Sequence, residues 1–158
     1  MPIATKLREF LDRNGIKYQV IHHSQAFTAQ ELAAAMHVSG KEMAKTVVVK
    51  SGGAFHMVVL PATRKVDFSA LRRELGGKET ALATEQEFSD LFPGCEPGAM
   101  PPFGNLYELP VIASRSLAED EEIVFNAGTH TDAIRMHYAD FEKLVKPAIR
   151  EIDKPAGV

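Results

Sequence analysis

The stretch "AKTVVVKSGGAFHMVVLPA", residues 44–62, predicts a β-hairpin and with it the centre of the fold. Two runs rich in β-branched and aromatic residues flank Ser51–Gly53, where glycines supply the positive φ angles of a tight turn. Because side chains alternate along a strand, Lys45, Val47 and Val49 share one face of the first run. Two interpretations of Lys45 stay open: a strand-end lysine that extends its ammonium into solvent, or a point charge that holds a phosphate.

Helices and short strands surround this hairpin in an irregular order. Capping boxes at 28–31 and 84–87 and an Asp67 cap predict helix starts, and apolar spacing adds helices at 3–14 and 139–145. We expect further strands at 17–23, 80–84, 109–114, 121–128 and 131–138, and a loose tail after Pro147. Because no regular βαβ alternation appears, the pattern predicts an α+β fold with a mixed, mainly antiparallel sheet, as one domain over residues 1–158.

Composition narrows the class of protein. The chain has 158 residues, 45% hydrophobic and 25% charged, as in ordinary globular domains, and its apolar runs are too short to span a bilayer. The N-terminus has no apolar signal segment, and one cysteine excludes an internal disulfide, so we expect a cytoplasmic protein without a membrane partner. A net charge of −3 argues against DNA or long nucleic acid, although a local basic patch is still compatible with one nucleotide end.

The loop "CEPGAMPPFGN", residues 95–105, is stiff and nearly uncharged. Glycines let a backbone approach a ligand closely, and Pro101 and Pro102 restrict the path of the chain. The prolines have no amide hydrogen, so donors come from Gly98, Ala99 and Met100, or from the two residues after the prolines. Such amides stabilise a developing oxyanion without any charged side chain, but the same stretch also suits a rigid connector.

The stretch "NAGTHTD", residues 126–132, is a glycine-containing corner that leads into a strand. Gly128 is followed by Thr129, His130 and Asp132. An imidazole titrates near neutrality, so His130 is a candidate general base or substrate ligand. The alternative is a plain hairpin turn with a polar residue at its rim.

The sequence gives weaker support for a metal site, a thiol nucleophile or a basic binding surface. His22 and His23 are adjacent, and His130 and His137 fall on opposite faces of a strand, so we predict no metal site and no cofactor. Cys95 has no helix start or basic neighbour to activate it, which favours an incidental thiol over a nucleophile. The basic pairs at 64–65 and 72–73 are best explained as a solvated surface.

Taken together, these pieces resemble a known family. "FTAQELAAAMHVSGKEMAKTVVVK", "GAMPPFG" and "EEIVFNAGTHTDAIRM" are similar, in this order, to the YbaK family of aminoacyl-tRNA deacylases, related to the editing domain of bacterial prolyl-tRNA synthetase. The resemblance runs from about Thr28 to Leu144. It implies the family's fold, a mixed sheet or partly closed barrel surrounded by helices.

The resemblance also implies a substrate and roles for residues. The substrate is the 3′ acceptor end of a tRNA that carries the wrong amino acid as an ester. The family's lysine matches Lys45, its GxxxP loop matches Gly98 to Pro102, and its pocket strand matches Gly128 to Asp132. The candidate catalytic residues are therefore Lys45, Gly98 and Pro102. The candidate substrate-binding residues are Thr46, Ala99, Met100, Pro101, Gly128, Thr129, His130 and Asp132.

The resemblance leaves the edited amino acid open. Alanine-clearing members have Asn after the lysine, whereas Thr46 stands here, as in the cysteine-clearing branch, and other motifs favour branches that clear small or hydroxylated residues. We expect a free-standing enzyme that acts in trans, with a synthetase or an elongation factor as a helper. The alternatives are a non-catalytic, tRNA-end or nucleotide-binding regulatory module of the same fold and, last, a thiol enzyme that uses Cys95.

Overall fold

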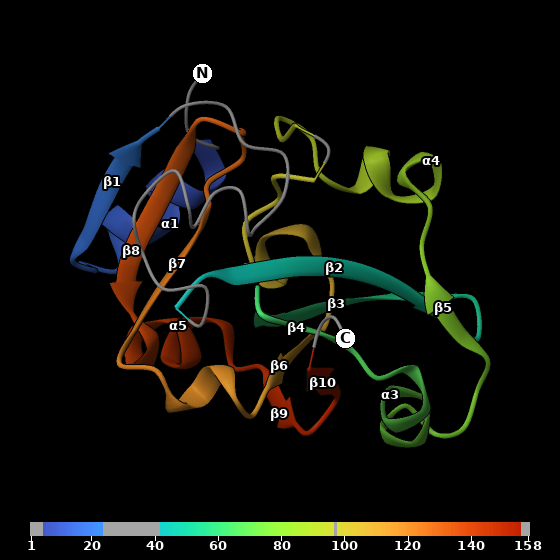
Figure 1. The fold of residues 1–158 in the computed structure, drawn as a ribbon. Coiled ribbons are helices and arrows are strands. Elements are labelled where there is room, and N and C mark those ends of the chain that lie inside the picture. The colour runs from blue at the N-terminus through green and yellow to red at the C-terminus, as the bar shows by residue number, and fades with distance from the viewer. Residues whose placement is uncertain (1–4, 24–41, 97, 156–158) are drawn as a thin grey trace.

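The structure is a computed structural model that describes residues 5–23, 42–96 and 98–155. Its helices are α1 (Thr5–Arg13), α3 (Phe68–Glu74), α4 (Glu85–Phe88) and α5 (Tyr138–Val145), with 3-10 turns at Ser89–Leu91, Gly104–Tyr107 and Leu117–Glu119. Its strands are β1 (Tyr18–His22), β2 (Ala44–Ser51), β3 (Ala54–Pro61), β4 (Arg64–Val66), β5 (Thr80–Leu82), β6 (Val111–Ser114), β7 (Glu122–Asn126), β8 (Asp132–His137), β9 (Ala148–Arg150) and β10 (Asp153–Pro155). Figure 1 shows the β2–β3 hairpin crossing the middle of the molecule.

The strands form three sheets. A five-stranded sheet has the order β5-β2-β3-β6-β9, a three-stranded sheet has the order β1-β8-β7, and β10 pairs with β4. Most pairs are antiparallel, whereas β3–β6 and β6–β9 are parallel. A parallel bridge from Met43 to Val124 brings β7 beside the start of β2 and links the two larger sheets. The predicted α+β class with a mixed, mainly antiparallel sheet is confirmed.

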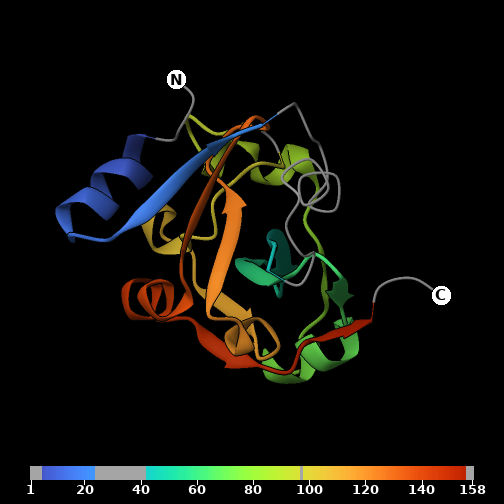
Figure 2. The same ribbon diagram turned by 60° about the vertical axis from the view of Figure 1, so that its left-hand side comes forward.

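The central hairpin separates two cores, as its alternation requires. Ala44 and Val48 of β2 belong to the larger core, which also contains residues of α1, α5, β7 and β8. Val49 belongs to a smaller core under α3, and Val47 packs against it. Figures 1 and 2 agree with this division: α1 and α5 lie toward one side of the molecule and α3 toward the other. The two faces of β2 therefore serve different parts of the protein.

Local sequence signals explain several boundaries. The Asp67 carboxylate accepts hydrogen bonds from the amides of Ser69 and Ala70, which starts α3 as predicted. Thr84 and Glu87 form the predicted capping box at the start of α4. The other predicted capping box, at residues 28–31, and its helix lie outside the described residues.

The expectation of a loose tail after Pro147 is wrong. Residues 148–150 form β9 against β6, and residues 153–155 form β10 against β4. Ile152, between these strands, is completely buried in the smaller core. Asp153 accepts hydrogen bonds from the hydroxyls of Ser114 and Ser116 and pairs with Arg64, so polar contacts also hold the tail. No helix in the described parts of the chain combines the length and apolar character that a bilayer crossing requires.

Candidate active site

The structure brings the GxxxP loop and the Gly128 corner together through the backbone. The Glu96 amide donates to the Gly128 carbonyl at 2.7 Å, and the Gly128 amide donates to the Ala99 carbonyl at 2.9 Å. A turn inside the loop adds a bond from the Ala99 amide to the Glu96 carbonyl at 3.0 Å. Two short bonds therefore fix the first part of the loop against a corner about 30 residues further along the chain, and the third closes the turn inside the loop. We call this group, residues 96–102 and 127–132 without Pro97, the loop–corner site.

The second half of the loop is anchored by aromatic packing. Phe103 is fully buried, and its ring centroid lies 5.6 Å from that of Phe125 and 5.7 Å from that of Phe141. Pro101 and Pro102, which precede it, are buried as well. At Gly104 an added Cβ would lie 2.6 Å from a Val111 methyl carbon, so the chain has no room for a side chain there. The stiffness predicted from the prolines thus has a tertiary counterpart at the end of the loop.

Gly98 is the point where the loop faces an imidazole. Its φ angle is +83°, a conformation that glycine adopts without strain. A Cβ built on it would lie 3.5 Å from His130 Cε1 and 4.0 Å from His130 Nε2, so the ring lies directly beside the bare backbone. The Gly98 amide donates to Met100 Sδ at 3.3 Å. Because a thioether is a weak acceptor, this amide is easily redirected to a stronger one.

His130 is positioned by a residue that the sequence pattern did not single out for a role. The His130 amide donates to Glu96 Oε1 at 2.6 Å, and the residue is only 7% exposed. Glu96 therefore acts twice, through its backbone on Gly128 and through its carboxylate on His130. The one available signal was that Glu96 and Cys95 are the ionisable residues of an otherwise uncharged loop.

Asp132 organises the corner from inside. It is 1% exposed, and its Oδ2 accepts hydrogen bonds from Thr129 Oγ1 at 2.7 Å and Thr131 Oγ1 at 3.1 Å. Its Oδ1 contacts His22 Nδ1 on the neighbouring strand β1. The carboxylate thus holds the shape of the corner, and its contact with His22 was hidden from the sequence because it joins residues 110 positions apart.

Lys45 lies at the start of β2 and is half-buried. Its side chain lines a cavity of about 390 Å³, together with Val47, Lys65, Val66, Phe68, Leu82 and Lys154. Burial lowers the pKa of its ammonium below the ordinary value. Within the described residues no hydrogen bond or ion pair joins Lys45 to the loop–corner site. The predicted sharing of a face by Lys45, Val47 and Val49 is confirmed, since Val47 lines the same cavity and Val49 lies in the core below.

Thr46 and the bridge between β2 and β7 lie between the Lys45 cavity and the loop–corner site. Thr46 lies on the opposite face of β2 from Lys45, the face whose Ala44 and Val48 share the larger core with Met100. The parallel bridge from Met43 to Val124 makes β2 and β7 run in the same direction. From there β2 continues through Lys45, and β7 continues to the Gly128 corner. The start of β2 therefore lies between the lysine cavity and the strand that leads to the loop–corner site.

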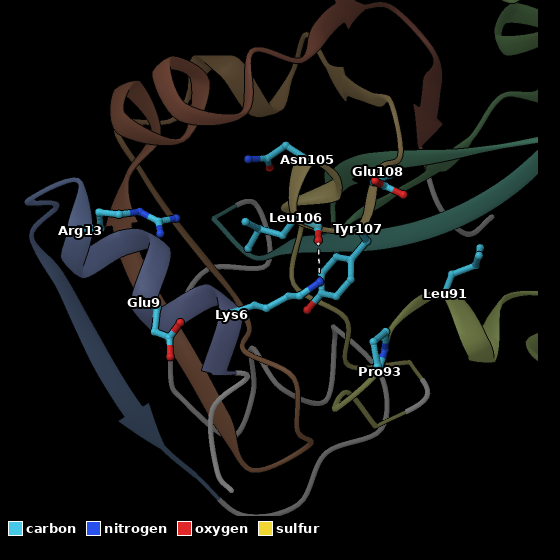
Figure 3. A pocket seen from close by; sticks show the side chains of 9 residues that line it. All are labelled: Lys6, Glu9, Arg13, Leu91, Pro93, Asn105, Leu106, Tyr107 and Glu108. Atoms are coloured by element: carbon cyan, nitrogen blue, oxygen red, sulfur yellow. Dashed lines mark hydrogen bonds between the residues drawn. The ribbon is translucent and has the colours of Figure 1, made fainter.

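A larger cavity, of about 620 Å³, lies elsewhere and contains none of the predicted site residues (Figure 3). It is lined by Lys6, Glu9, Arg13, Leu91, Pro93, Asn105, Leu106, Tyr107 and Glu108. The Lys6 ammonium donates to the Leu106 carbonyl at 3.2 Å and lies over the Tyr107 ring. Two cationic and two acidic side chains balance one another there, so the lining has no preference for an anion.

A comparison with known protein families identifies the family of this chain. The sequence profile described as the aminoacyl-tRNA editing domain matches residues 23–144. This chain belongs to the aminoacyl-tRNA editing domain family. The resemblance to the YbaK family is thereby confirmed over nearly the range inferred from the sequence. Members of the family are aminoacyl-tRNA deacylases, which are hydrolases that act on mischarged aminoacyl-tRNA.

Individual relatives agree with this assignment. The Multifunctional Ser/Thr-tRNA deacylase ProXp-y of Escherichia coli (strain K12) is 29% identical over 149 residues, which are 91% of this chain and 89% of that protein. A crystal structure of the hypothetical protein APE2540 has a TM-score of 0.84 at 21% identity and covers 94% of this chain and 99% of its own. A crystal structure of a candidate trans-editing enzyme for prolyl-tRNA synthetase has a TM-score of 0.82 at 21% identity, with 98% of each chain covered. The two structures support the fold.

Two further features bear on the chemistry of this editing domain. Cys95 Sγ lies 3.4 Å from Tyr107 Oη, and burial raises the pKa of the thiol above its ordinary value, which disfavours the thiolate. In the described parts of the chain, no group of three or more His, Cys, Asp or Glu side chains is arranged to hold a metal ion.

Proposed function

We propose that this chain is a trans-editing aminoacyl-tRNA deacylase that hydrolyses the ester of a mischarged tRNA carrying a small amino acid. The observation that carries the proposal is the placement of the His130 imidazole against the bare backbone of Gly98, within a loop fixed by bonds between Glu96, Ala99 and Gly128. A reactive ester needs accurate placement more than a strong nucleophile, and misplacement by an angstrom costs orders of magnitude in rate.

In the proposed reaction, a water attacks the carbonyl carbon of the ester. The carbonyl oxygen becomes an oxyanion, the bond from carbon to the ribose oxygen breaks, and that oxygen takes the proton lost by the water. The products are the free amino acid and a tRNA with an intact 3′ end. The neighbouring ribose hydroxyl helps to place or activate the water, and Lys45 anchors the terminal phosphate or fixes the ester.

Amides of the loop are proposed to face the oxyanion. The Ala99 amide is occupied by the Glu96 carbonyl in the turn, whereas the Gly98 amide is given to the weakly accepting sulfur of Met100. An oxyanion is a much stronger acceptor than a thioether, so the Gly98 amide is the preferred donor. Pro102 keeps the end of the loop in place, and Ala99, Met100 and Pro101 shape the surface next to the ester.

His130, Thr129 and Thr46 are proposed to surround the amino-acid side chain, with Gly128 and Asp132 holding the corner in shape. A small or hydroxylated side chain suits these short polar neighbours. The printed activity of the Escherichia coli relative, a Ser/Thr-tRNA deacylase, supports this choice. Because one methylene changes binding by only ~1–3 kcal/mol, we expect a range of small esters to be hydrolysed at different rates.

The test is deacylation of tRNAs charged with Ala, Ser, Thr, Cys and Pro by the purified protein and by Lys45→Ala. We expect hydrolysis of one or more mismatched esters, with a loss of at least about 100-fold in Lys45→Ala. Lys143→Ala, an exposed lysine on α5, is the matched control and should behave as wild type. Wild-type rates in Lys45→Ala would refute the mechanism. No hydrolysis of any ester would favour the non-catalytic binding module.

A further inference from the structure

The cavity at Lys45 is lined by lysines from three separate segments. Lys45 comes from β2, Lys65 from β4 and Lys154 from β10. Its volume of about 390 Å³ is in the range of sites for small ligands. The other lining residues, Val47, Val66, Phe68 and Leu82, are apolar. The cavity lining thus combines three cationic side chains with four apolar ones.

The two outer lysines are held together by the fold. Lys154 and Lys65 are directly opposite each other in the antiparallel pair β10–β4. Like charges at such positions destabilise a sheet pair, and an anion bound between them would remove this repulsion. Some other cations of the described chain pair with carboxylates: Arg64 with Asp153, Lys50 with Glu87 and Arg150 with Glu74. Among the described residues, no carboxylate forms an ion pair with Lys45, Lys65 or Lys154.

The strand that carries Lys154 is fixed in place, so the pair is built into the protein. Asp153 accepts from Ser116 Oγ at 2.8 Å, contacts Ser114 Oγ, and pairs with Arg64 Nε at 2.9 Å. Ile152, one residue further back, is fully buried. These contacts hold Lys154 beside Lys65, and none of them involves the ammonium group of either lysine.

Part of the apolar lining of the cavity is exposed to solvent. Leu82 is 60% exposed, and Phe68 is only partly buried. Exposed apolar surface beside a cavity marks a binding site more often than a random surface does. Positive charge next to an apolar surface is the combination that binds single-stranded nucleic acid, because phosphates meet the cations and bases meet the apolar groups.

We propose that Lys65 and Lys154 bind phosphate groups of the single-stranded 3′ end of tRNA and direct this end toward Lys45 and the start of β2. The inference rests on the proposed function, and it adds two substrate-positioning residues that line the same cavity as Lys45. The anion occupies the place where the two ammonium groups would otherwise repel each other. Since phosphate contacts position a nucleic acid without reading its sequence, this site serves every tRNA equally.

The test separates binding from turnover. Binding of a labelled, uncharged single-stranded RNA ending in ACCA is measured against salt for wild type, Lys65→Ala/Lys154→Ala, Lys65→Arg/Lys154→Arg and the control Lys143→Ala. Each phosphate contact on a single strand contributes about 0.7 to the slope of log affinity against log salt, so the alanine pair should lower the slope by about 1.4. The arginine pair should keep it, because the charge is retained.

Steady-state deacylation of the best mischarged tRNA is measured on the same variants. We expect KM to rise roughly tenfold in the alanine pair while kcat stays within about twofold, because these contacts are equal in the ground state and the transition state. An unchanged salt slope and KM in an active enzyme would overturn the inference and leave the proposed function intact. A lowered slope in a protein without deacylase activity would support the inference and remove the proposed function.

Discussion

The loop–corner site and the lysine cavity are organised in opposite ways. The first is held by backbone hydrogen bonds of 2.7–3.0 Å, and its few ionisable side chains are already engaged, Glu96 with His130 and Asp132 with Thr129. The second combines three lysines with apolar lining residues, and no carboxylate of the described chain forms an ion pair with them. The hydrogen-bonded backbone and the unpaired positive charge are therefore in separate regions of this domain. In the proposed reaction, the first region would place the ester and the second would hold the polyanionic tRNA.

The comparison predicts that the largest effect follows from disturbing the rigid region. Gly98→Ala should lower kcat by roughly 100-fold, because an alanine at φ +83° is strained and its Cβ contacts His130 at 3.5 Å. Gly77→Ala is the matched control: its φ is +82° and no atom lies within 4 Å of the added Cβ. Both variants should lose about 1–2 kcal/mol of stability in urea denaturation, but only Gly98→Ala should lose activity. Equal activity in the two variants would contradict the role of the loop.

Glu96→Ala should have the next largest effect. It removes the acceptor of the His130 amide and should lower kcat/KM about tenfold, because the corner then loses the bond that ties His130 to the loop. Glu96→Gln keeps an acceptor oxygen and should recover most of the activity. If both variants behave alike, the carboxylate does not act through this hydrogen bond. Deacylation kinetics for the two variants, run beside Glu108→Ala as a control in an exposed turn, decide the question.

Lys45 should show that function and stability oppose each other in the lysine cavity. Burial lowers the pKa of Lys45 from 10.5, so the charged form is less stable in the folded protein than in the unfolded chain. Lys45→Met should therefore abolish deacylation and yet raise the free energy of unfolding at pH 7 by up to about 1 kcal/mol, a gain kept small by solvent at the half-exposed side chain.

The pH dependence of this difference has a definite sign. Between the lowered pKa of the folded protein and 10.5, the unfolded chain binds more protons, so wild-type stability rises with pH relative to Lys45→Met. Urea denaturation of both proteins at pH 7 and at successively higher pH measures this. A gap that widens with pH would contradict burial as the cause.

The smallest effect is expected at Cys95. Cys95→Ser should keep kcat/KM within about twofold, and alkylation of the wild type should leave turnover intact, since burial raises the pKa of the thiol and disfavours the thiolate. Kinetics before and after treatment with an alkylating agent provide the measurement. A large loss in both experiments would revive a thiol mechanism.

The sequence predicts those parts of the molecule that local patterns determine. The hairpin at 44–62, the Asp67 cap and the Thr84 capping box all depend on neighbours within a few residues, and the structure confirms them. The strands β4, β9 and β10 were missed because three residues such as "RKV" or "DKP" carry no period and are strands only through their partners. Tertiary pairing here overrides weak local preference.

The same distinction holds at the site. Lys45, Gly98 and His130 were singled out from chemistry and resemblance, and the face of Lys45 followed from alternation. The bond from His130 to Glu96 and the pairing of Lys65 with Lys154 were not foreseeable, because they join residues 34 and 89 positions apart. Contacts of this length follow from the whole fold, and no single stretch of sequence contains them.

The most direct test of a division of labour between the two regions combines their variants. Gly98→Ala, Lys65→Ala/Lys154→Ala and the triple variant are compared with wild type in deacylation of the best mischarged tRNA. We predict that the loop variant lowers kcat, that the lysine pair raises KM, and that the two losses in kcat/KM multiply in the triple variant, as for independent sites. Losses that do not multiply, or that fall on the same kinetic parameter, would contradict the account.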